Sequence, residues 1–198
     1  MRFLVVFCHP SQDSFGAALF NTTCETLKDS GHEIKKINLY EEKFDPILSL
    51  DEWNSYLDQT ELNINNVKQH VNNLLWAQGL ILIFPSWMYG PPALLKGWLE
   101  RVWLPGVAFE ISSSKQNIPK GKLKHIKRFC VITTSGSPRW WLWYIGNPGK
   151  SMLFKCYRIL FNSFCKFKWL QLYDMNHSTK EDRGKFIKKV SNYFCSIR

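Results

Sequence analysis

The 198-residue chain lacks the features that several protein classes require. Its apolar runs are far shorter than the roughly 20 residues of a membrane-spanning helix. The first residues hold one arginine and a short strand-like run that ends at Cys8, without the small-residue cleavage site of a signal peptide, so we expect a cytoplasmic protein. Repeats and low-complexity segments are also missing, and we expect a single domain over residues 1–198.

Three common catalytic and nucleotide-binding motifs are missing as well. No GxGxxG motif follows the first predicted strand, and no GxSxG motif occurs. Gly149-Lys150-Ser151 resembles the end of a phosphate-binding P-loop, but Tyr144 stands where that motif needs its first glycine. The sequence therefore gives no support to a dinucleotide-binding Rossmann domain, a P-loop enzyme or a serine hydrolase.

The six cysteines show none of the paired spacings of zinc or iron–sulfur sites, so we expect no metal. Buried thiols acting as small apolar side chains are the favoured interpretation. Cys8 and His9 could suggest a nucleophile and its base, but neighbouring residues of a strand point to opposite faces.

Acidic residues are few relative to basic ones, which gives a formal net charge of +10. No nucleic-acid recognition motif accompanies this charge, so we expect no nucleic-acid partner. A basic surface also suits phosphate-bearing substrates or contact with an anionic membrane.

Apolar runs and alternating patterns predict an α/β fold. Predicted strands cover residues 3–7, 33–39, 80–84, 128–134 and 167–173. Predicted helices cover residues 15–29, 62–76, 91–103, 150–166 and 179–195. We expect a mostly irregular connection over 40–58 and a surface hairpin or loop over 112–127. Helices between buried strands predict a doubly wound parallel five-stranded sheet with helices on both faces.

Three predicted loops, over residues 9–16, 85–91 and 133–138, follow strands and should converge on one crevice. The first is polar and opens a helix, which suits a phosphate, although a plain N-cap by Asp13 or Ser14 is the alternative. The other two combine small residues, free backbone amides and aromatic side chains, which suit a flat ring with polar edges. A flavin mononucleotide unit requires this combination.

These segments resemble the flavodoxin-like NAD(P)H:quinone oxidoreductases, which include quinone dehydrogenases, modulators of drug activity and ancillary oxidoreductases of potassium efflux systems. Phe84-Pro85 with residues 90–102 (GPPALLKGWLERV) resembles the family's strand–loop–helix block. His9 with Ser14-Phe15 resembles its flavin phosphate loop. Residues 133–136 resemble its Thr-Thr-Gly-Gly loop, with a serine in place of one glycine. The flavodoxin-like strand order is 2-1-3-4-5.

The resemblance implies a flavin (FAD or FMN), NADPH or NADH as electron donor, and a quinone or similar acceptor. Hydride would pass to flavin N5, and two electrons would then pass to the acceptor. The implied phosphate-end residues are His9, Ser14 and Phe15. Those at the ring's pyrimidine and N5 edges are Pro85, Ser86, Trp87, Met88 and Tyr89. Those at its other edge are Thr133, Thr134, Ser135 and Gly136.

The chain departs from the family at the proton-handling positions. The tyrosine and histidine that follow the glycine loop in the mammalian enzyme correspond to Trp141 and Asn147. We therefore expect Tyr144, or solvent, to supply the proton. The aromatic cluster of residues 140–144 is either part of the core or of a homodimer cap, or a wall against which a quinone stacks.

Two further interpretations stay open at this point. The basic and aromatic segment 150–168 is either an ordinary packing helix or a contact with an anionic membrane. The alternative function is that of an ancillary regulatory subunit on a membrane potassium efflux system. A flavodoxin-type electron carrier is disfavoured by the positive charge.

Overall fold

A parallel five-stranded sheet forms the centre of the computed structural model, which describes residues 1–111 and 118–197. The strand order is β2-β1-β3-β6-β7, so the five strands follow the expected 2-1-3-4-5 arrangement. The bounds are β1 Arg2–Phe7, β2 Glu33–Asn38, β3 Gly79–Pro85, β6 Arg128–Thr134 and β7 Lys166–Leu172. The predicted doubly wound α/β fold is confirmed, and each predicted strand lies within one or two residues of an observed one.

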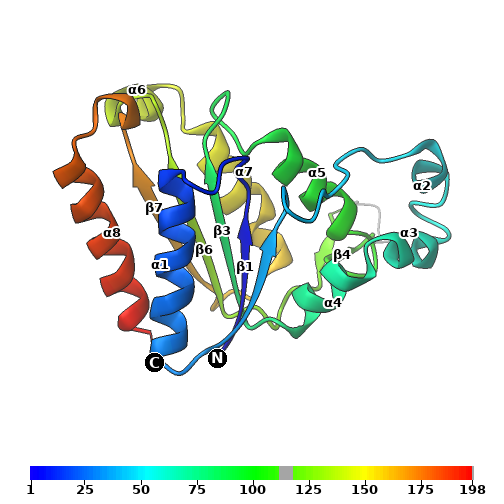
Figure 1. Ribbon diagram of the computed structural model, residues 1–198. Coiled ribbons are helices and arrows are strands. Elements are labelled where there is room, and N and C mark those ends of the chain that lie inside the picture. The colour runs from blue at the N-terminus through cyan, green and yellow to red at the C-terminus, as the bar shows by residue number, and fades with distance from the viewer. Residues whose placement is uncertain (112–117, 198) are drawn as a thin grey trace.

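Helices cover both faces of this sheet (Figure 1). On one face lie α1 and α8, which also pack against each other. On the other face lie α4, α5 and α7. Successive residues of β1 alternate between the two layers, because side chains of a strand point to opposite sides: Val5 belongs to the core under α1, and Val6 to the core under α5. The bounds of these helices are α1 Phe15–Asp29, α4 Lys68–Trp76, α5 Ala93–Val102, α7 Pro148–Phe154 and α8 Lys180–Cys195.

Smaller elements surround this core. A short antiparallel pair is formed by β4, Phe109–Glu110, and β5, Lys120–Gly121. The predicted hairpin or loop over 112–127 therefore contains one strand of a hairpin, while residues 112–117 lie outside the described part of the chain. The remaining elements are α2 Leu50–Asn54, α3 Thr60–Asn66, α6 Arg139–Tyr144 and the 3-10 helices η1 Cys156–Leu160 and η2 Met175–His177.

The predicted helix 150–166 is wrong in its second half. The helix α7 ends at Phe154, η1 follows, and Phe161 has left the helix to form an isolated bridge with Leu123. The cause is a tertiary contact: the Leu123 N–H donates to the carbonyl of Leu160, at 2.9 Å. Gly121 makes room for this approach, since a Cβ on it would lie 2.2 Å from the carbonyl oxygen of Ile159.

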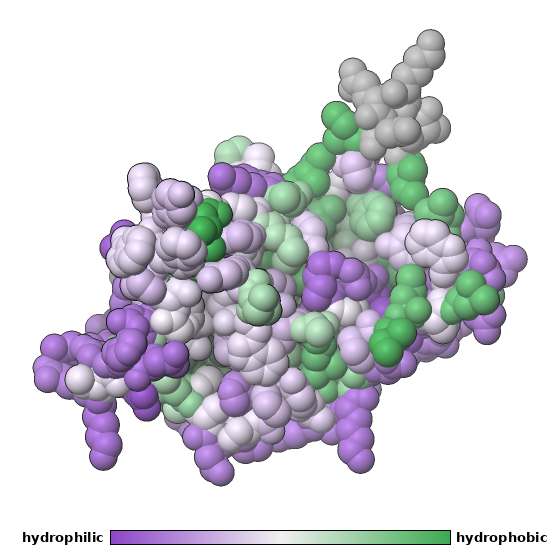
Figure 2. Space-filling model, turned by 90° about the horizontal axis from the view of Figure 1, so that it is seen from above, coloured by the Kyte–Doolittle hydropathy of each residue, from purple (hydrophilic) through white to green (hydrophobic). Residues whose placement is uncertain are grey.

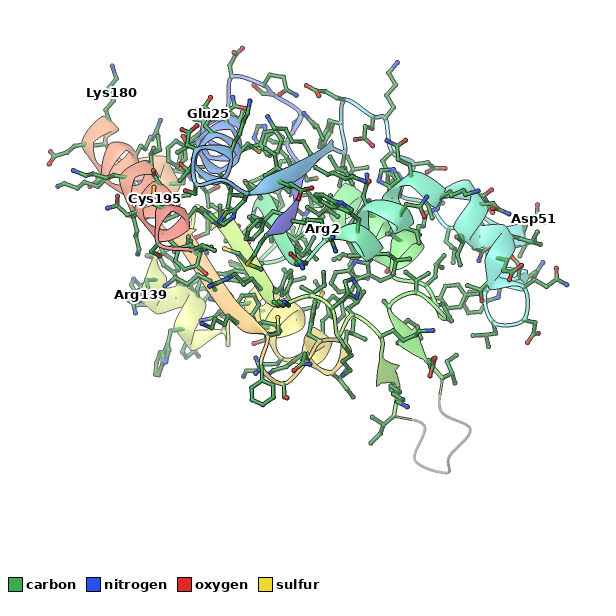
Figure 3. The ribbon with its side chains drawn as sticks, turned by 90° about the horizontal axis from the view of Figure 1, so that it is seen from below. Arg2, Glu25, Asp51, Arg139, Lys180 and Cys195 are labelled. Carbon is green, nitrogen blue, oxygen red and sulfur yellow. The ribbon has the colours of Figure 1, made fainter. Side chains whose placement is uncertain are left out.

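Two other predictions need correction. The predicted helix 62–76 is divided into α3 and α4 at Val67, whose φ of −125° is not helical. The connection 40–58 contains α2, which is capped by a reciprocal pair of bonds between Ser49 and Glu52. Figure 3 shows Asp51 of α2 at the end of the molecule opposite Lys180 of α8.

A buried ion pair fastens this outlying segment to the core. Arg101, near the end of α5, bonds the carboxylate of Glu52, and both side chains are largely buried. Burial alone would raise the pKa of the Glu52 carboxyl, but bonds from Ser49, Arg101 and Asn66 outweigh it and hold that pKa below its usual value.

Most of the cysteines behave as the sequence predicts. Cys8, Cys24, Cys130 and Cys165 are buried, whereas Cys156 and Cys195 are exposed. Burial raises the pKa of the Cys8 thiol to about 12, so it stays protonated and unreactive at neutral pH. Within residues 1–111 and 118–197 no cluster of potential metal ligands occurs, and no helix is long and apolar enough to cross a membrane.

Candidate flavin cleft

The carboxyl ends of β1, β3 and β6 meet at one edge of the sheet. Ile83 lies opposite Phe7, and Thr134 lies opposite Pro85, in the parallel register. The loops that leave these strands enclose a cavity of about 340 Å³, which is within the range of small-molecule sites. Figure 2 looks down on this edge, where much of the surface is pale, of intermediate hydropathy.

The three loops singled out in the sequence converge on this cavity, as predicted. The predicted site residues that line it are His9, Ser14, Phe15, Pro85, Ser86, Trp87, Thr133, Thr134, Ser135 and Gly136. Three predicted residues do not line it: Met88, Tyr89 and Tyr144.

The N-terminus of α1 forms one end of the cavity. Ser14 is its N-cap, and the Ser14 hydroxyl oxygen accepts from the Ala17 N–H at 3.1 Å. The N–H groups of Phe15 and Gly16 have no protein acceptor among the described residues, as expected for a first helical turn. That turn carries no acidic residue. The N-cap alternative is therefore observed, and the same turn still offers free donors and a positive helix end to an anion.

His9 stands beside this helix end with one ring nitrogen already engaged. The Ser11 N–H donates to His9 Nδ1 at 3.0 Å, and Nδ1 also lies 3.1 Å from the Ser11 carbonyl oxygen. When Nδ1 accepts from the Ser11 N–H, the ring proton lies on Nε2; the other tautomer would instead donate from Nδ1 to the Ser11 carbonyl. In the first tautomer Nε2 remains available as a donor to a ligand in the cavity.

The loop after β3 is a tight turn, and Pro85, Ser86 and Trp87 at its start line the cavity. Trp87 and Gly90 exchange two backbone hydrogen bonds of 3.0 Å, and the two residues between them have positive φ, 47° for Met88 and 64° for Tyr89. The Met88 side chain at the tip is 94% exposed. The Ser86 N–H donates to the Thr134 carbonyl at 2.7 Å, which fixes this loop to the next one.

The loop after β6 is held by its own hydroxyl groups and by β7. The Ser135 N–H donates to the Leu172 carbonyl at 2.9 Å, and its hydroxyl donates to the Ser137 carbonyl at 3.1 Å. The serine that replaces a family glycine is therefore accommodated with its hydroxyl paired. A Cβ on Gly136 would lie 3.1 Å from the side-chain nitrogen of Asn176, which explains the small residue there.

Comparison with known proteins identifies the architecture. A family model described as a flavodoxin-like fold matches residues 1–194. The chain belongs to the flavodoxin-like family. This result confirms the resemblance to flavodoxin-like NAD(P)H:quinone oxidoreductases that the strand-end loops suggested.

Named relatives agree with this family assignment. An uncharacterized NAD(P)H oxidoreductase of Haemophilus influenzae is 32% identical over 139 residues, which are 67% of this chain and 64% of that protein. NAD(P)H dehydrogenase [quinone] 1 of Rattus norvegicus is 30% identical over 151 residues, 69% of this chain and 54% of that protein. The chain spans between about half and just under two thirds of the first curated relatives it matches.

Solved structures have the same fold. A crystal structure from Streptococcus mutans covers all of this chain and is itself covered completely, at 26% identity and a TM-score of 0.85. An FMN-dependent NADH-azoreductase from Bacillus anthracis, solved in complex with FMN, shares the fold at 18% identity and a TM-score of 0.73, with coverages of 98% of this chain and 97% of that chain.

Seven residues that line this site were not among the predicted ones: Gly16, Leu19, Ile83, Phe84, Ile132, Met175 and Asn176. Met175 and Asn176 reach the cavity from η2, just after β7. They follow the last strand of the sheet, so the rule that placed the other loops at the carboxyl edge could have found them.

The helix α6 lies at the rim of the cavity rather than inside it. Trp141 Nε1 donates to the Tyr89 hydroxyl at 3.2 Å, and the Trp141 ring lies 5.6 Å from that of Tyr144. Tyr144 is 72% exposed, and Trp140 and Trp143 are also exposed, which rules out the core alternative for these three residues and leaves the homodimer cap and the quinone wall as predictions.

Proposed function

We propose that this protein is a flavin-dependent NAD(P)H:quinone oxidoreductase. The observation that carries the proposal is the single cavity in which a helix N-terminus, His9 and two amide-rich loops meet at the carboxyl edge of a flavodoxin-like sheet. The names of the curated relatives support the reaction class.

The residues present fit the phosphate end of a flavin. Phe15 and Gly16 offer unpaired backbone N–H groups, and the Ser14 hydroxyl can donate its proton while its oxygen caps the helix. With its proton on Nε2, His9 adds a donor there. A phosphate there would meet several donors and no carboxylate of the helix's first turn, which suits a doubly charged group.

The other two loops fit the flat ring. The pyrimidine edge would lie against the backbone of residues 85–87, and the opposite edge against Thr133, Thr134 and Gly136. The fixed turn around Trp87 and the paired hydroxyl of Ser135 hold these loops in place before a ligand binds, which lowers the ordering cost of binding. Met88 and Tyr89 would contribute only to the rim.

A bound flavin would accept hydride from a nicotinamide and return two electrons to a quinone. The chain's own part is to bind and orient the flavin and to neutralise its negative charge. The Ser86, Trp87 and Ser135 N–H groups are already bonded within the protein, so negative charge at the ring's polar edge would be stabilised by the N–H of Gly136, which has no protein acceptor among the described residues. Trp87, which lines the cavity and is partly exposed, offers an apolar face to a flat acceptor.

Solvent is the better placed of the two proton sources considered. The Tyr144 hydroxyl belongs to a side chain that is largely exposed and does not line the cavity. The cavity opens to water at the same rim. Tyr144 would act only if α6 moved toward the cavity.

Several finer features belong to the same proposal. The cofactor is FAD or FMN, the donor NADPH or NADH, and the site residues are those named above. The resemblance also predicts a homodimer, and the sequence itself predicts one domain over residues 1–198 and a cytoplasmic location. Light scattering of the purified protein tests the oligomeric state.

Flavin uptake tests the cofactor assignment. The apoprotein, incubated with FMN or FAD and freed of excess ligand, should retain the absorbance bands of one of them. Chromatography of the flavin released by denaturation identifies which. A protein that retains neither flavin would contradict the proposal.

A further inference from the structure

A second cleft lies beside α6, separate from the flavin cavity. Its volume is about 440 Å³, and it is lined by α6, α7 and the end of β7. The polar and aromatic side chains that line it include Arg139, Trp143, Lys150, Ser151, Lys155 and Tyr173. None of these residues lines the flavin cavity.

The cleft holds positive charge without compensation. Arg139, Lys150 and Lys155 all line it, and no carboxylate does among the described residues. In the part of the chain that the structure describes, none of the three forms an ion pair, whereas Lys96 and Lys185 do. An anion in the cleft would therefore face three cations and no opposing charge.

Neutral donors complete the cleft. Burial raises the pKa of the Tyr173 phenol, and the nearby Arg139 guanidinium acts in the opposite direction. The phenol therefore keeps its proton at neutral pH and can donate it to an anion. Ser151 is already engaged, since its hydroxyl donates to the Gly146 carbonyl at 2.9 Å. The donor set is typical of a site for a phosphate group.

One wall of the cleft is an exposed aromatic ring. Trp143 is 82% exposed, and Trp140 and Tyr144 on the same helix are exposed too. Large exposed aromatics with a polar edge are unfavourable in water and are enriched at the interface of a membrane with water. Cations beside interfacial aromatics are the combination by which a peripheral protein binds anionic lipids.

We propose that this cleft binds the phosphate group of an anionic phospholipid and thereby docks α6 on a membrane surface. Trp143 would lie among the headgroups, with the three cations on the lipid phosphates. The flavin cavity, which lies at the same carboxyl edge of the sheet as α6 (Figure 1), would then open close to the membrane. The inference does not depend on the proposed enzymatic reaction.

Charge favours a lipid surface over the other candidate occupants. A second copy of this chain also carries a net charge of +10, and a two-fold contact at this cleft would bring like charges together. A free phosphate would fill the cleft but leave Trp143 in water. A homodimer formed through another surface leaves the cleft accessible.

Vesicle co-sedimentation tests the proposal. The full chain should bind vesicles that contain phosphatidylglycerol and not vesicles of phosphatidylcholine alone. A variant without the cleft cations should bind about 100-fold more weakly, because each basic residue near an anionic surface contributes roughly a fivefold factor. That variant carries the substitutions Arg139→Gln, Lys150→Gln and Lys155→Gln.

A control variant of the same net charge separates the cleft from the general basicity of the protein. It removes three exposed lysines of α1 and α8, which cover the other layer of the sheet: Lys28→Gln, Lys188→Gln and Lys189→Gln. We expect less than a tenfold loss for it. Equal losses in both triple variants would overturn the proposal, as would undiminished binding by the cleft variant.

Quenching by brominated lipid chains reports insertion of the aromatic wall. Trp143→Phe should remove part of the quenching, and the double variant Trp140→Phe with Trp143→Phe should remove most of it, whereas Trp53→Phe, at an exposed tryptophan of α2, should remove little. Unchanged quenching in Trp143→Phe would contradict the docking geometry. If glycerol 3-phosphate binds at the cleft but vesicles do not, the cleft is a site for a free phosphate. If Trp143 is buried in a dimer, the cleft is an interface with a second copy of this chain. Either result overturns the proposal.

Discussion

The N-cap serine of α1 offers a sharp test of where the flavin phosphate lies. Ser14 caps the helix through its hydroxyl oxygen, and it also lines the cavity. Ser14→Ala removes both roles. The cap contributes about 1 kcal/mol to the free energy of unfolding, so the flavin-free variant should melt about 2–4 °C lower. The lost bond to a charged phosphate is worth roughly 1.5–3 kcal/mol, so flavin affinity should fall by at least about tenfold.

Ser14→Asp separates these two roles. Aspartate is as good an N-cap as serine, and its charge suits the positive helix end, so the flavin-free protein should keep its stability. The same carboxylate would stand beside the flavin phosphate. Repulsion between two unit charges about 4 Å apart costs roughly 1 kcal/mol in bulk water and roughly 4 kcal/mol near a protein surface. We take a cost of about 2 kcal/mol, which lowers the affinity for flavin about 30-fold.

Fluorescence titration of the apoprotein with FMN and FAD measures these affinities, and thermal melts of the flavin-free variants measure stability. Ser49→Ala is the control, because it removes the N-cap of α2, which lies away from the cavity. It should lower stability and leave flavin affinity unchanged. If Ser14→Asp binds flavin as tightly as the natural protein, the phosphate does not lie at α1 and the assigned orientation is refuted.

Three further predictions concern the frame and the rim of the site. Glu52→Gln leaves the buried Arg101 with only the more distant and exposed Asp45 carboxylate, at 3.9 Å, and should lower the free energy of unfolding by about 1.5–3 kcal/mol in urea titrations. Because the folded-state pKa of Glu52 is lowered, the carboxylate's contribution to the free energy of unfolding is complete above the usual pKa of 4.5 and is lost as the pH falls below it. The natural protein should therefore lose stability in that acid range more steeply than the variant. Equal slopes of stability against pH would contradict the direction of the pKa shift. Gly97→Ala places a Cβ 2.3 Å from the Pro46 carbonyl oxygen, and we expect a loss of about 1–3 kcal/mol in the same assay, whereas an unchanged midpoint would contradict that close packing. Tyr144→Phe should change both half-reactions less than about twofold in stopped-flow absorbance, since general acid catalysis by that phenol would be worth at least about 100-fold.

The parts of the fold that follow from local chemistry could be predicted from the sequence. The apolar run in β3, which ends at Pro85, predicts the central strand. The predicted parallel strands on either side of it predict the edge of the sheet at which the loops gather. Because parallel strands place their carboxyl ends together, ten predicted site residues line one cavity.

The parts that depend on tertiary contacts could not be predicted. Helical spacing continues past Phe154, but α7 ends at that residue and η1 ends at Leu160, whose carbonyl accepts from the Leu123 N–H, and no local pattern encodes that contact. Likewise, nothing in residues 140–144 shows that Trp141 faces Tyr89 while Tyr144 lies outside the cavity. The cleft of Arg139 and Lys155 is formed by segments that meet only in the folded chain.

Anaerobic spectroscopy of the flavin-loaded protein tests the central claim most directly. Addition of NADPH or NADH should bleach the visible flavin bands, and addition of a quinone should restore them without oxygen, in two separable steps. Bleaching followed by recovery would establish both half-reactions at this site. A protein whose bound flavin is not reduced by either nicotinamide, or that holds no flavin, would contradict the account.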